Sequence, residues 1–113
     1  MELKNLEDKF KKRKIAVIGD VMLDHYVFGE TKRISPEAPV PVLVVNKETY
    51  CPGGAGNVAA NITALGGEAY LFGCIGSDES GKKLVQEEKK LKIKPYQYPT
   101  QKTTTKKTRI IAT

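Results

Sequence analysis

Residues 51–67 read CPGGAGNVAANITALGG, and this stretch decides how the chain folds. A proline and two glycines, Gly53 and Gly54, lead into an alanine-rich segment, which a second glycine pair closes. The pattern predicts a helix over 53–65 that stops at that second pair. This helix would begin on bare backbone, whereas a helix formed only for packing usually has a Ser, Thr or Asp N-cap.

The uncapped start of this helix indicates a binding site. The first N–H groups of a helix have no intrahelical acceptor and carry the positive end of the helix dipole. Gly53 and Gly54 would let a ligand approach the backbone closely. Asn57, in the first turn, can donate and accept hydrogen bonds at once, as contact with a sugar hydroxyl requires. The alternative is that the glycines only form a tight turn and that Asn57 caps the helix locally.

Strands and helices alternate on both sides of this stretch, which favours an α/β fold with a mostly parallel sheet. KIAVIGD, at 14–20, predicts a buried parallel strand whose C-terminal end carries a glycine turn. The other expected elements are helices over 3–12 and 77–91, strands over 69–76 and 103–113, and a loop or short edge strand over 94–101.

A strand pair interrupts this alternation. DHYVFGETKRI mixes aromatic, β-branched and charged residues, and VLVVNKETY also has strand composition. The segment between them, SPEAPVP, contains three prolines and cannot be helical throughout. We therefore expect residues 24–46 to form a small β flap that lies off the main sheet.

Composition excludes several function classes. The chain has 113 residues, enough for one small domain, and a formal net charge of +6. No aromatic residues alternate with the basic ones, so nucleic-acid binding is not indicated. No apolar run is long enough for a membrane helix, and no export signal precedes the first strand, so a cytoplasmic location is expected. The two cysteines and one histidine lack metal-ligand spacing, so we expect reduced thiols and no metal site.

Two aspartates follow the first predicted strand, in IGDVMLDHY. Asp20 and Asp24 lie near the sheet edge at which ligands bind in open α/β folds. Asp24 could accept hydrogen bonds from sugar hydroxyls. The alternative is that both are solvated turn residues.

Two cations share one face of the last predicted strand. Alternate residues of a strand point the same way, so Lys107 and Arg109 lie on one face together with Thr105. Two cations on one face suit a phosphate monoester. A charged edge strand that only prevents aggregation is the alternative.

GSDESGKK, at 76–83, imitates a nucleotide-binding P-loop. Lys83 stands where the Mg²⁺-binding hydroxyl should be, and Asp78 and Glu79 would repel phosphate. A helix start capped by Ser77 or Asp78 explains the stretch better.

Taken together, these stretches resemble the ribokinase-like, or PfkB, family of carbohydrate kinases. GDVMLDHYVFG, RISPEAPVPV and PGGAGNVAANI are most similar to the heptose 7-phosphate kinases of that family, and the similarity runs from about Lys14 to the C-terminus. The residues that follow the family's first signature are Gly53, Gly54, Ala55, Gly56, Asn57, Val58, Ala59, Gly66 and Gly76.

The resemblance implies a ribokinase-like fold and assigns roles to the candidate residues. Gly53, Gly54, Asn57 and Asp24 match residues that hold sugar hydroxyls. The flap would cover the sugar and pair two subunits in a homodimer. The complete enzyme would use ATP and Mg²⁺ to phosphorylate heptose 7-phosphate at O1, a step toward ADP-heptose and lipopolysaccharide. The remaining matches, which would face the 7-phosphate, are Lys107 and Arg109.

The family's second signature, a glycine-rich anion hole followed by the catalytic aspartate, does not occur in the sequence. We therefore expect residues 1–113 to be the N-terminal sugar-binding part of a truncated kinase domain that is inactive alone and lacks the nucleotide-binding part. The alternative is a non-catalytic, stand-alone module for sugar-phosphate binding or dimerisation. A Rossmann-like nucleotide domain is a third alternative, which the sequence disfavours because G-x-G-x-x-G does not follow the first strand.

Overall fold

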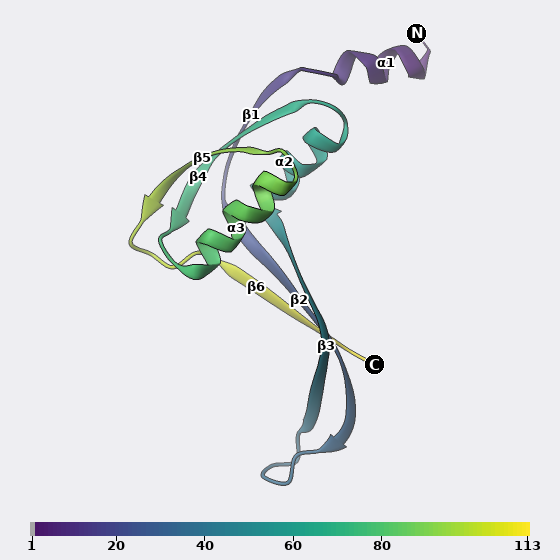
Figure 1. Ribbon diagram of the computed structural model, residues 1–113, viewed down its shortest axis with the longest axis vertical. Helices are drawn as coiled ribbons and strands as arrows, with labels where there is room; N and C mark the ends of the chain where they lie inside the picture. The colour runs from purple at the N-terminus through teal and green to yellow at the C-terminus, as the bar shows by residue number, and fades with distance from the viewer. Residues whose placement is uncertain (1) are drawn as a thin grey trace.

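The computed structural model describes residues 2–113, which form two three-stranded sheets (Figure 1). One sheet has the order β1-β4-β5 and the other β3-β2-β6. The helices and strands are α1 (Leu3–Phe10), β1 (Lys14–Ile18), β2 (Val21–Ile34), β3 (Pro41–Gly54), α2 (Ala55–Ala64), β4 (Glu68–Gly76), α3 (Glu79–Lys90), β5 (Lys94–Thr100) and β6 (Lys106–Ala112).

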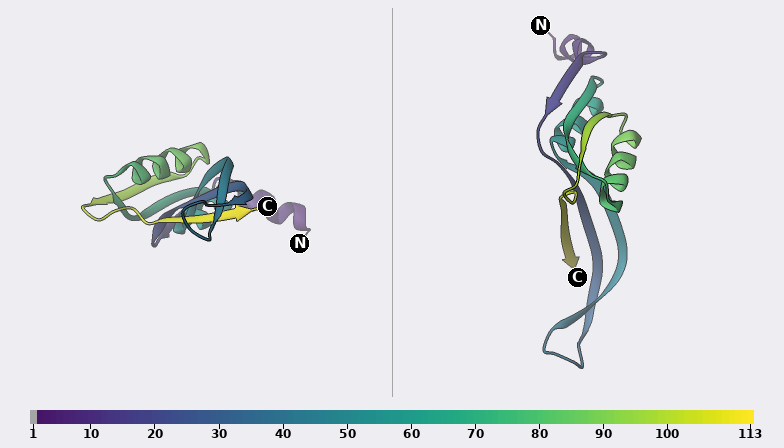
Figure 2. Two further views of the ribbon diagram at one scale, coloured as in Figure 1. Left: turned by 90° about the horizontal axis from the view of Figure 1, so that it is seen from below. Right: turned by 90° about the vertical axis from the view of Figure 1, so that its left-hand side faces the viewer.

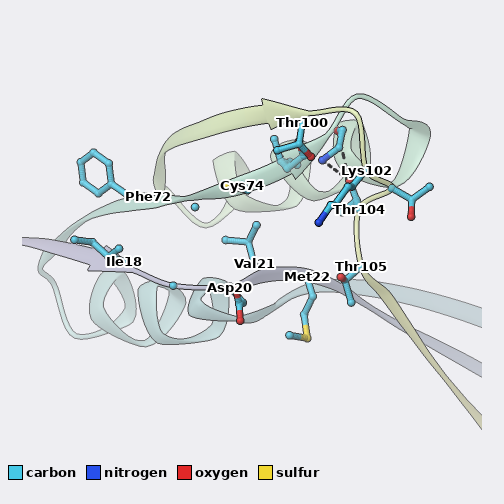
Figure 3. A pocket seen from close by; sticks show the side chains of 15 residues that line it. Ile18, Asp20, Val21, Met22, Phe72, Cys74, Thr100, Lys102, Thr104 and Thr105 are labelled. Atoms are coloured by element: carbon cyan, nitrogen blue, oxygen red, sulfur yellow. Dashed lines mark hydrogen bonds between the residues drawn. The ribbon is translucent and has the colours of Figure 1, made fainter.

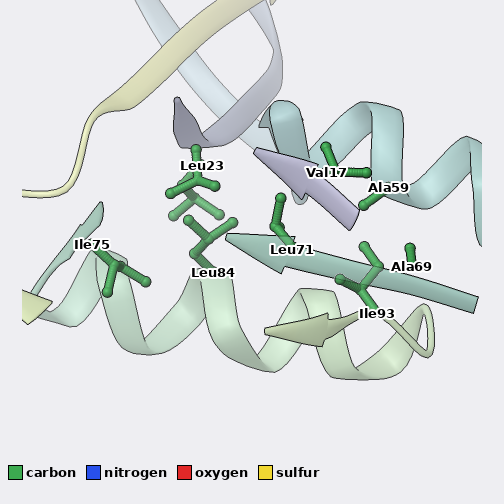
Figure 4. Packing of buried hydrophobic residues seen from close by; sticks show 9 residues of the cluster. Val17, Leu23, Ala59, Ala69, Leu71, Ile75, Leu84 and Ile93 are labelled. Carbon is green, nitrogen blue, oxygen red and sulfur yellow. The ribbon is translucent and has the colours of Figure 1, made fainter. Parts of the chain in front are cut away.

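The β1-β4-β5 sheet is parallel throughout, as the alternation of strands and helices predicted. Alternate residues of β4 point toward α2 and α3 and form the core with residues from both helices (Figure 4). Leu71 of β4 and Leu84 of α3 are fully buried at its centre. The other members of this cluster are Val17, Val21, Leu23, Ala59, Ala69, Ile75 and Ile93.

The opposite face of this sheet is uncovered among the described residues. Tyr96 of β5 stacks on Tyr70 and Phe72 of β4, with ring centroids 6.0 and 5.5 Å apart. Ile18 is 82% exposed and Tyr98 is 73% exposed. Parallel sheets are normally covered on both faces, whereas this face leaves aromatic side chains exposed in the described part of the chain.

The prediction that the strand at 14–20 is buried is wrong. A strand forms there and pairs in parallel with β4, but of the five residues of β1 only Val17 is buried. The reason is position, because β1 lies at the edge of the sheet and has a neighbour on one side only.

The flap is confirmed as a strand pair, and it is longer than predicted. β2 and β3 pair antiparallel from Val21 with Gly54 to Ile34 with Pro41, and the proline-containing segment joins them without a helix. The views in Figure 2 show this ribbon extending away from the helices. The strand predicted over 103–113 is confirmed as β6, which is shorter than predicted, pairs in parallel with β2 and is exposed at the edge of the sheet.

Asp78 is the N-cap of α3, one of the two residues predicted for that position. Its carboxylate accepts hydrogen bonds from the Gly81 N–H at 2.9 Å and from the Thr104 N–H and hydroxyl at 2.9 and 2.7 Å. These bonds hold the Asp78 pKa below its usual value. They also fix the start of the segment that leads into β6. Leu91 follows the end of α3 as its C-cap residue and is 42% exposed.

Glu88 is a fully buried carboxyl group on α3. The side-chain amide of Gln97 on β5 donates to its two oxygens at 2.8 and 2.7 Å. Burial raises the pKa of Glu88, and the hydrogen bonds from Gln97 offset this only in part.

We predict that Glu88 makes the protein less stable as the pH rises. Since the folded pKa lies above the ordinary value of 4.5, the stability due to the neutral acid is complete below that value and is lost as the pH rises through the folded pKa. Melting temperatures of the parent chain and Glu88→Gln from pH 4 to 8 test this. The melting temperature of Glu88→Gln should increase relative to that of the parent as the pH rises. The melting temperature of Glu79→Gln, a substitution at an exposed position, should show no such trend. Parallel curves for Glu88→Gln and the parent would contradict the prediction.

Candidate functional site

A glycine directly precedes α2 because the backbone requires one there. Gly54 is the N-cap residue, has φ +59° and receives no side-chain cap. A Cβ atom at this position would lie 2.5 Å from the carbonyl oxygen of Asp20, the oxygen that accepts the first N–H of the helix, from Ala55, at 2.8 Å. The helix therefore starts at Ala55 and not at Gly53 as predicted, and both glycines belong to the end of β3.

Gly53 makes room for a carboxylate. A Cβ atom there would lie 2.6 Å from the carboxyl carbon and both oxygens of Asp24. Gly53 is directly opposite Met22 in the β2–β3 pair, and Asp24 is two residues further along the same face. The two adjacent glycines thus have different purposes, one for the backbone turn and one for the side chain of Asp24.

Asp24 lies at the centre of the β3-β2-β6 sheet and is paired with a cation. Its Cα partners are Cys51 on β3 and Lys107 on β6. The side chain is 15% exposed, and Oδ1 is enclosed without a hydrogen bond, 3.6 Å from the Lys107 ammonium nitrogen. A carboxylate with so little hydration is costly without compensating charge, and Lys107 supplies that charge. Burial and, to a smaller extent, the neighbouring Asp24 raise the pKa of the Cys51 thiol.

Arg109 follows on the same face of β6, as predicted from strand alternation. It is the Cα partner of Tyr26, and its guanidinium carbon lies 5.6 Å from the centre of the Tyr26 ring. Phe28 stacks on Tyr26 at 6.5 Å, and the Lys47 ammonium lies 5.9 Å from the Phe28 ring. This face therefore combines cations with two aromatic rings beside Asp24.

Asn57 is the third residue of α2 and is exposed. Within residues 2–113 its side chain makes no hydrogen bond, so local capping does not account for it. Contacts join Asp24 to Gly53 and Lys107, and Gly54 to the neighbouring Asp20 and Met22. No such contact joins Asn57 to Asp24 in the described part of the chain.

His25 is a buried residue of the β3-β2-β6 sheet whose structural role the sequence analysis did not identify. It is buried on the other face of β2, and its Nδ1 and Nε2 lie 3.1 Å from Thr108 Oγ1 and 3.0 Å from Glu48 Oε1. Its ring stacks on Tyr50 at 4.5 Å. These contacts connect all three strands of the sheet one residue away from the Asp24 row. The sequence did hold one signal for this role, because His25 is a polar residue that alternates with Leu23 and Val27 on one face of a strand.

A cleft of about 760 Å³ lies at the carboxyl ends of β1 and β4. Asp20 lines it, as expected for that sheet edge, but Asp24 does not. Figure 3 shows Val21 pointing toward β4 and Met22 pointing the other way, and Asp24 follows Met22 by alternation. The other lining residues are Ile18, Gly19, Phe72, Gly73, Cys74, Ile75, Gly76, Thr100, Lys102, Thr103, Thr104 and Thr105.

The described residues offer neither a metal cluster nor a membrane span. Nowhere in 2–113 do three or more His, Cys, Asp or Glu side chains gather as metal ligands. No helix in the same range is long and apolar enough to cross a bilayer.

Comparison with known proteins gives a family and several relatives. The model of the pfkB family carbohydrate kinase matches residues 12–113. "Bifunctional protein HldE" of Caulobacter sp. (strain K31) is 55% identical over 82 residues, which is 73% of this chain and 17% of that protein. The protein of the same name from a Nitratiruptor species is 48% identical over 101 residues, 89% of this chain and 22% of its own length. The chain thus matches about a fifth of each relative.

Solved structures share the fold. A carbohydrate kinase from Agrobacterium tumefaciens superposes with a TM-score of 0.70 at 22% identity, over 88% of this chain and 32% of that one. Phosphofructokinase-2 from Escherichia coli, in complex with fructose-6-phosphate, gives a TM-score of 0.67 at 22% identity. The match covers 88% of this chain and 31% of that one. The expected ribokinase-like α/β fold is therefore confirmed, and the chain matches about a third of these kinases.

We predict that Gly54→Ala destabilises the protein by about 1 to 3 kcal/mol, because alanine disfavours a positive φ and its Cβ would contact the Asp20 carbonyl oxygen. Chemical denaturation measures the loss. Val58→Ala, at an exposed position of the same helix, is the control and should change stability much less. Equal unfolding midpoints for Gly54→Ala and the parent would show that the turn tolerates a side chain.

Proposed function

Because the chain belongs to the pfkB family of carbohydrate kinases, we propose that it is the sugar-binding part of a kinase that phosphorylates heptose 7-phosphate at O1. The reaction would serve ADP-heptose and lipopolysaccharide formation in the cytoplasm. Relatives named HldE at about 50% identity support this substrate. The observation that carries the proposal is the Asp24 carboxylate, held beside Gly53 with cations and aromatic rings on the same face.

Sugar hydroxyls are the groups that this carboxylate suits. An ionised carboxylate only accepts hydrogen bonds, and a hydroxyl is a donor that it can orient. Gly53 and Gly54 present backbone next to it, and Asn57 adds a side chain that both donates and accepts. Together these residues would fix one face of the sugar and so select its hydroxyl pattern.

A phosphorylated sugar is favoured over a neutral one by the charge of β6. Lys107 and Arg109 place two cations on the Asp24 face. One carboxylate cannot neutralise both, so the face keeps positive charge for a phosphate monoester.

ATP and Mg²⁺ do not fit the described residues, although the complete enzyme would use both. Asp78 occupies the start of α3, the position that a P-loop would offer to phosphate. Within 2–113 no acidic cluster is present to hold Mg²⁺. We assign the nucleotide, the metal and the base to a part of the kinase domain beyond the matched third, and the uncovered aromatic face of β1-β4-β5 is a surface on which it would pack.

The flap would also pair two copies of the protein. Its outer part exposes apolar side chains on both strands and in the segment that joins them, as expected of a surface that is buried on association. These residues are Ile34, Val40, Val44 and Val45. A homodimer through the flap is the partner we propose besides the sugar phosphate.

We predict that Asp24→Asn lowers the affinity for heptose 7-phosphate about tenfold or more, because the isosteric amide loses the charge that strengthens its hydrogen bonds. Asn57→Ala should cost about 0.5 to 1.5 kcal/mol of binding free energy and leave the melting temperature unchanged. Calorimetric titration of the purified chain measures both, with Asn46→Ala in the flap as control. Unchanged affinity in Asp24→Asn would refute the proposed site.

We further predict that the 113-residue chain alone forms no ADP from ATP in the presence of Mg²⁺ and heptose 7-phosphate. Phosphoryl transfer needs a positioned nucleotide, a metal and usually a base, and the described residues fit none of them. A coupled assay for ADP tests this. ADP formation above background that Asp24→Ala abolishes would contradict the prediction.

A further inference from the structure

We infer that Lys107 belongs to the hydroxyl site, as the positioning residue of Asp24, and that Arg109 is the residue of this face that binds the phosphate group. This inference rests on the proposed function. It assigns different roles to Lys107 and Arg109, although both lie on the same face of β6. The division follows from what each side chain contacts.

Lys107 already forms an ion pair with Asp24. It is the Cα partner of Asp24 across the β2–β6 pair, and its ammonium nitrogen lies 3.6 Å from Oδ1. Among residues 2–113 no other cation comes within 4.0 Å of this carboxylate. The Asp24 side chain is 15% exposed and the Lys107 side chain is 56% exposed, so solvent reaches the ammonium end of the pair but little of the carboxylate.

The two oxygens of Asp24 are not equivalent. Oδ1 is enclosed, has no hydrogen bond and faces Lys107. A sugar hydroxyl would therefore meet the carboxylate through Oδ2. Lys107 keeps the charge and orientation of the carboxylate in place without touching the sugar, and its loss would leave a poorly solvated anion with no partner.

Arg109 is placed differently. Its guanidinium lies over the Tyr26 ring, 5.6 Å from the centroid, and no carboxylate of the described residues pairs with it. A guanidinium held over an aromatic ring keeps N–H groups that point away from the ring, and these can bind a phosphate with two parallel hydrogen bonds. Tyr26 thus restricts the guanidinium without using its donors.

The strand register holds this division in place. His25 Nδ1 and Thr108 Oγ1 are 3.1 Å apart on the opposite face, between the Asp24–Lys107 and Tyr26–Arg109 rows. A slip of β6 by one residue would break that contact and turn both cations to the wrong face.

The test is calorimetric titration of the purified chain with heptose 7-phosphate and with the same heptose lacking phosphate. Lys107→Ala should weaken the binding of both sugars by a similar factor, about tenfold. Arg109→Ala should weaken only the phosphorylated sugar, by about tenfold, and so reduce the ratio of the two affinities. Lys107→Arg, which keeps a cation beside Asp24, should restore most of the affinity for the neutral sugar.

Lys106→Ala is the matched control, because it removes the same charge from the neighbouring position on the other face of β6. It should leave both affinities within about twofold of the parent. A loss confined to the phosphorylated sugar in Lys107→Ala, or an equal loss in Lys106→Ala, would overturn the inference while the proposed function stands. A parent chain that binds neither sugar would overturn both.

Discussion

The hydrogen bond from the Ala55 N–H to the Asp20 carbonyl oxygen, 2.8 Å long, closes the base of the flap, and the rest of the site depends on it. The bond joins the start of β2 to the start of α2, so the chain leaves the parallel sheet and returns to it at one point. Only a residue at positive φ with no Cβ allows this approach, which is why Gly54 precedes the helix. With the base closed, antiparallel pairing brings Gly53 opposite Met22 and clears the space that Asp24 fills.

Strand alternation then gives the β3-β2-β6 sheet two faces with different tasks. One face carries the charged side chains of Asp24, Lys107 and Arg109, which we propose as ligand contacts. The other carries His25, which contacts Thr108 and Glu48 and so connects the three strands. Because these residues alternate one by one along β2 and β6, the buried polar contact on one face sets the positions of the charges on the other. This contact fixes the register of the exposed edge strand β6 against β2.

Much of this arrangement could be predicted from the sequence, since turn glycines, strand alternation and the helix N-cap are local signals. The fold class, the flap, the parallel strands and Asp78 as N-cap were predicted in this way. The pairing of Asp24 with Lys107 was not, because it depends on β2 and β6 being neighbours although they lie far apart in the sequence. The exposure of β1, the buried Glu88 and the role of His25 also depend on tertiary neighbours that no local pattern reveals. The ligand roles of all the candidate site residues stay predictions; these residues are Asp24, Gly53, Gly54, Asn57, Lys107 and Arg109.

The crystal structure of the chain bound to heptose 7-phosphate tests the central claim most directly. The account predicts a sugar hydroxyl within hydrogen-bond distance of Asp24 Oδ2, Lys107 still beside Oδ1, and the phosphate at the guanidinium edge of Arg109. A sugar bound instead in the threonine-lined cleft at the ends of β1 and β4, away from Asp24, would contradict it.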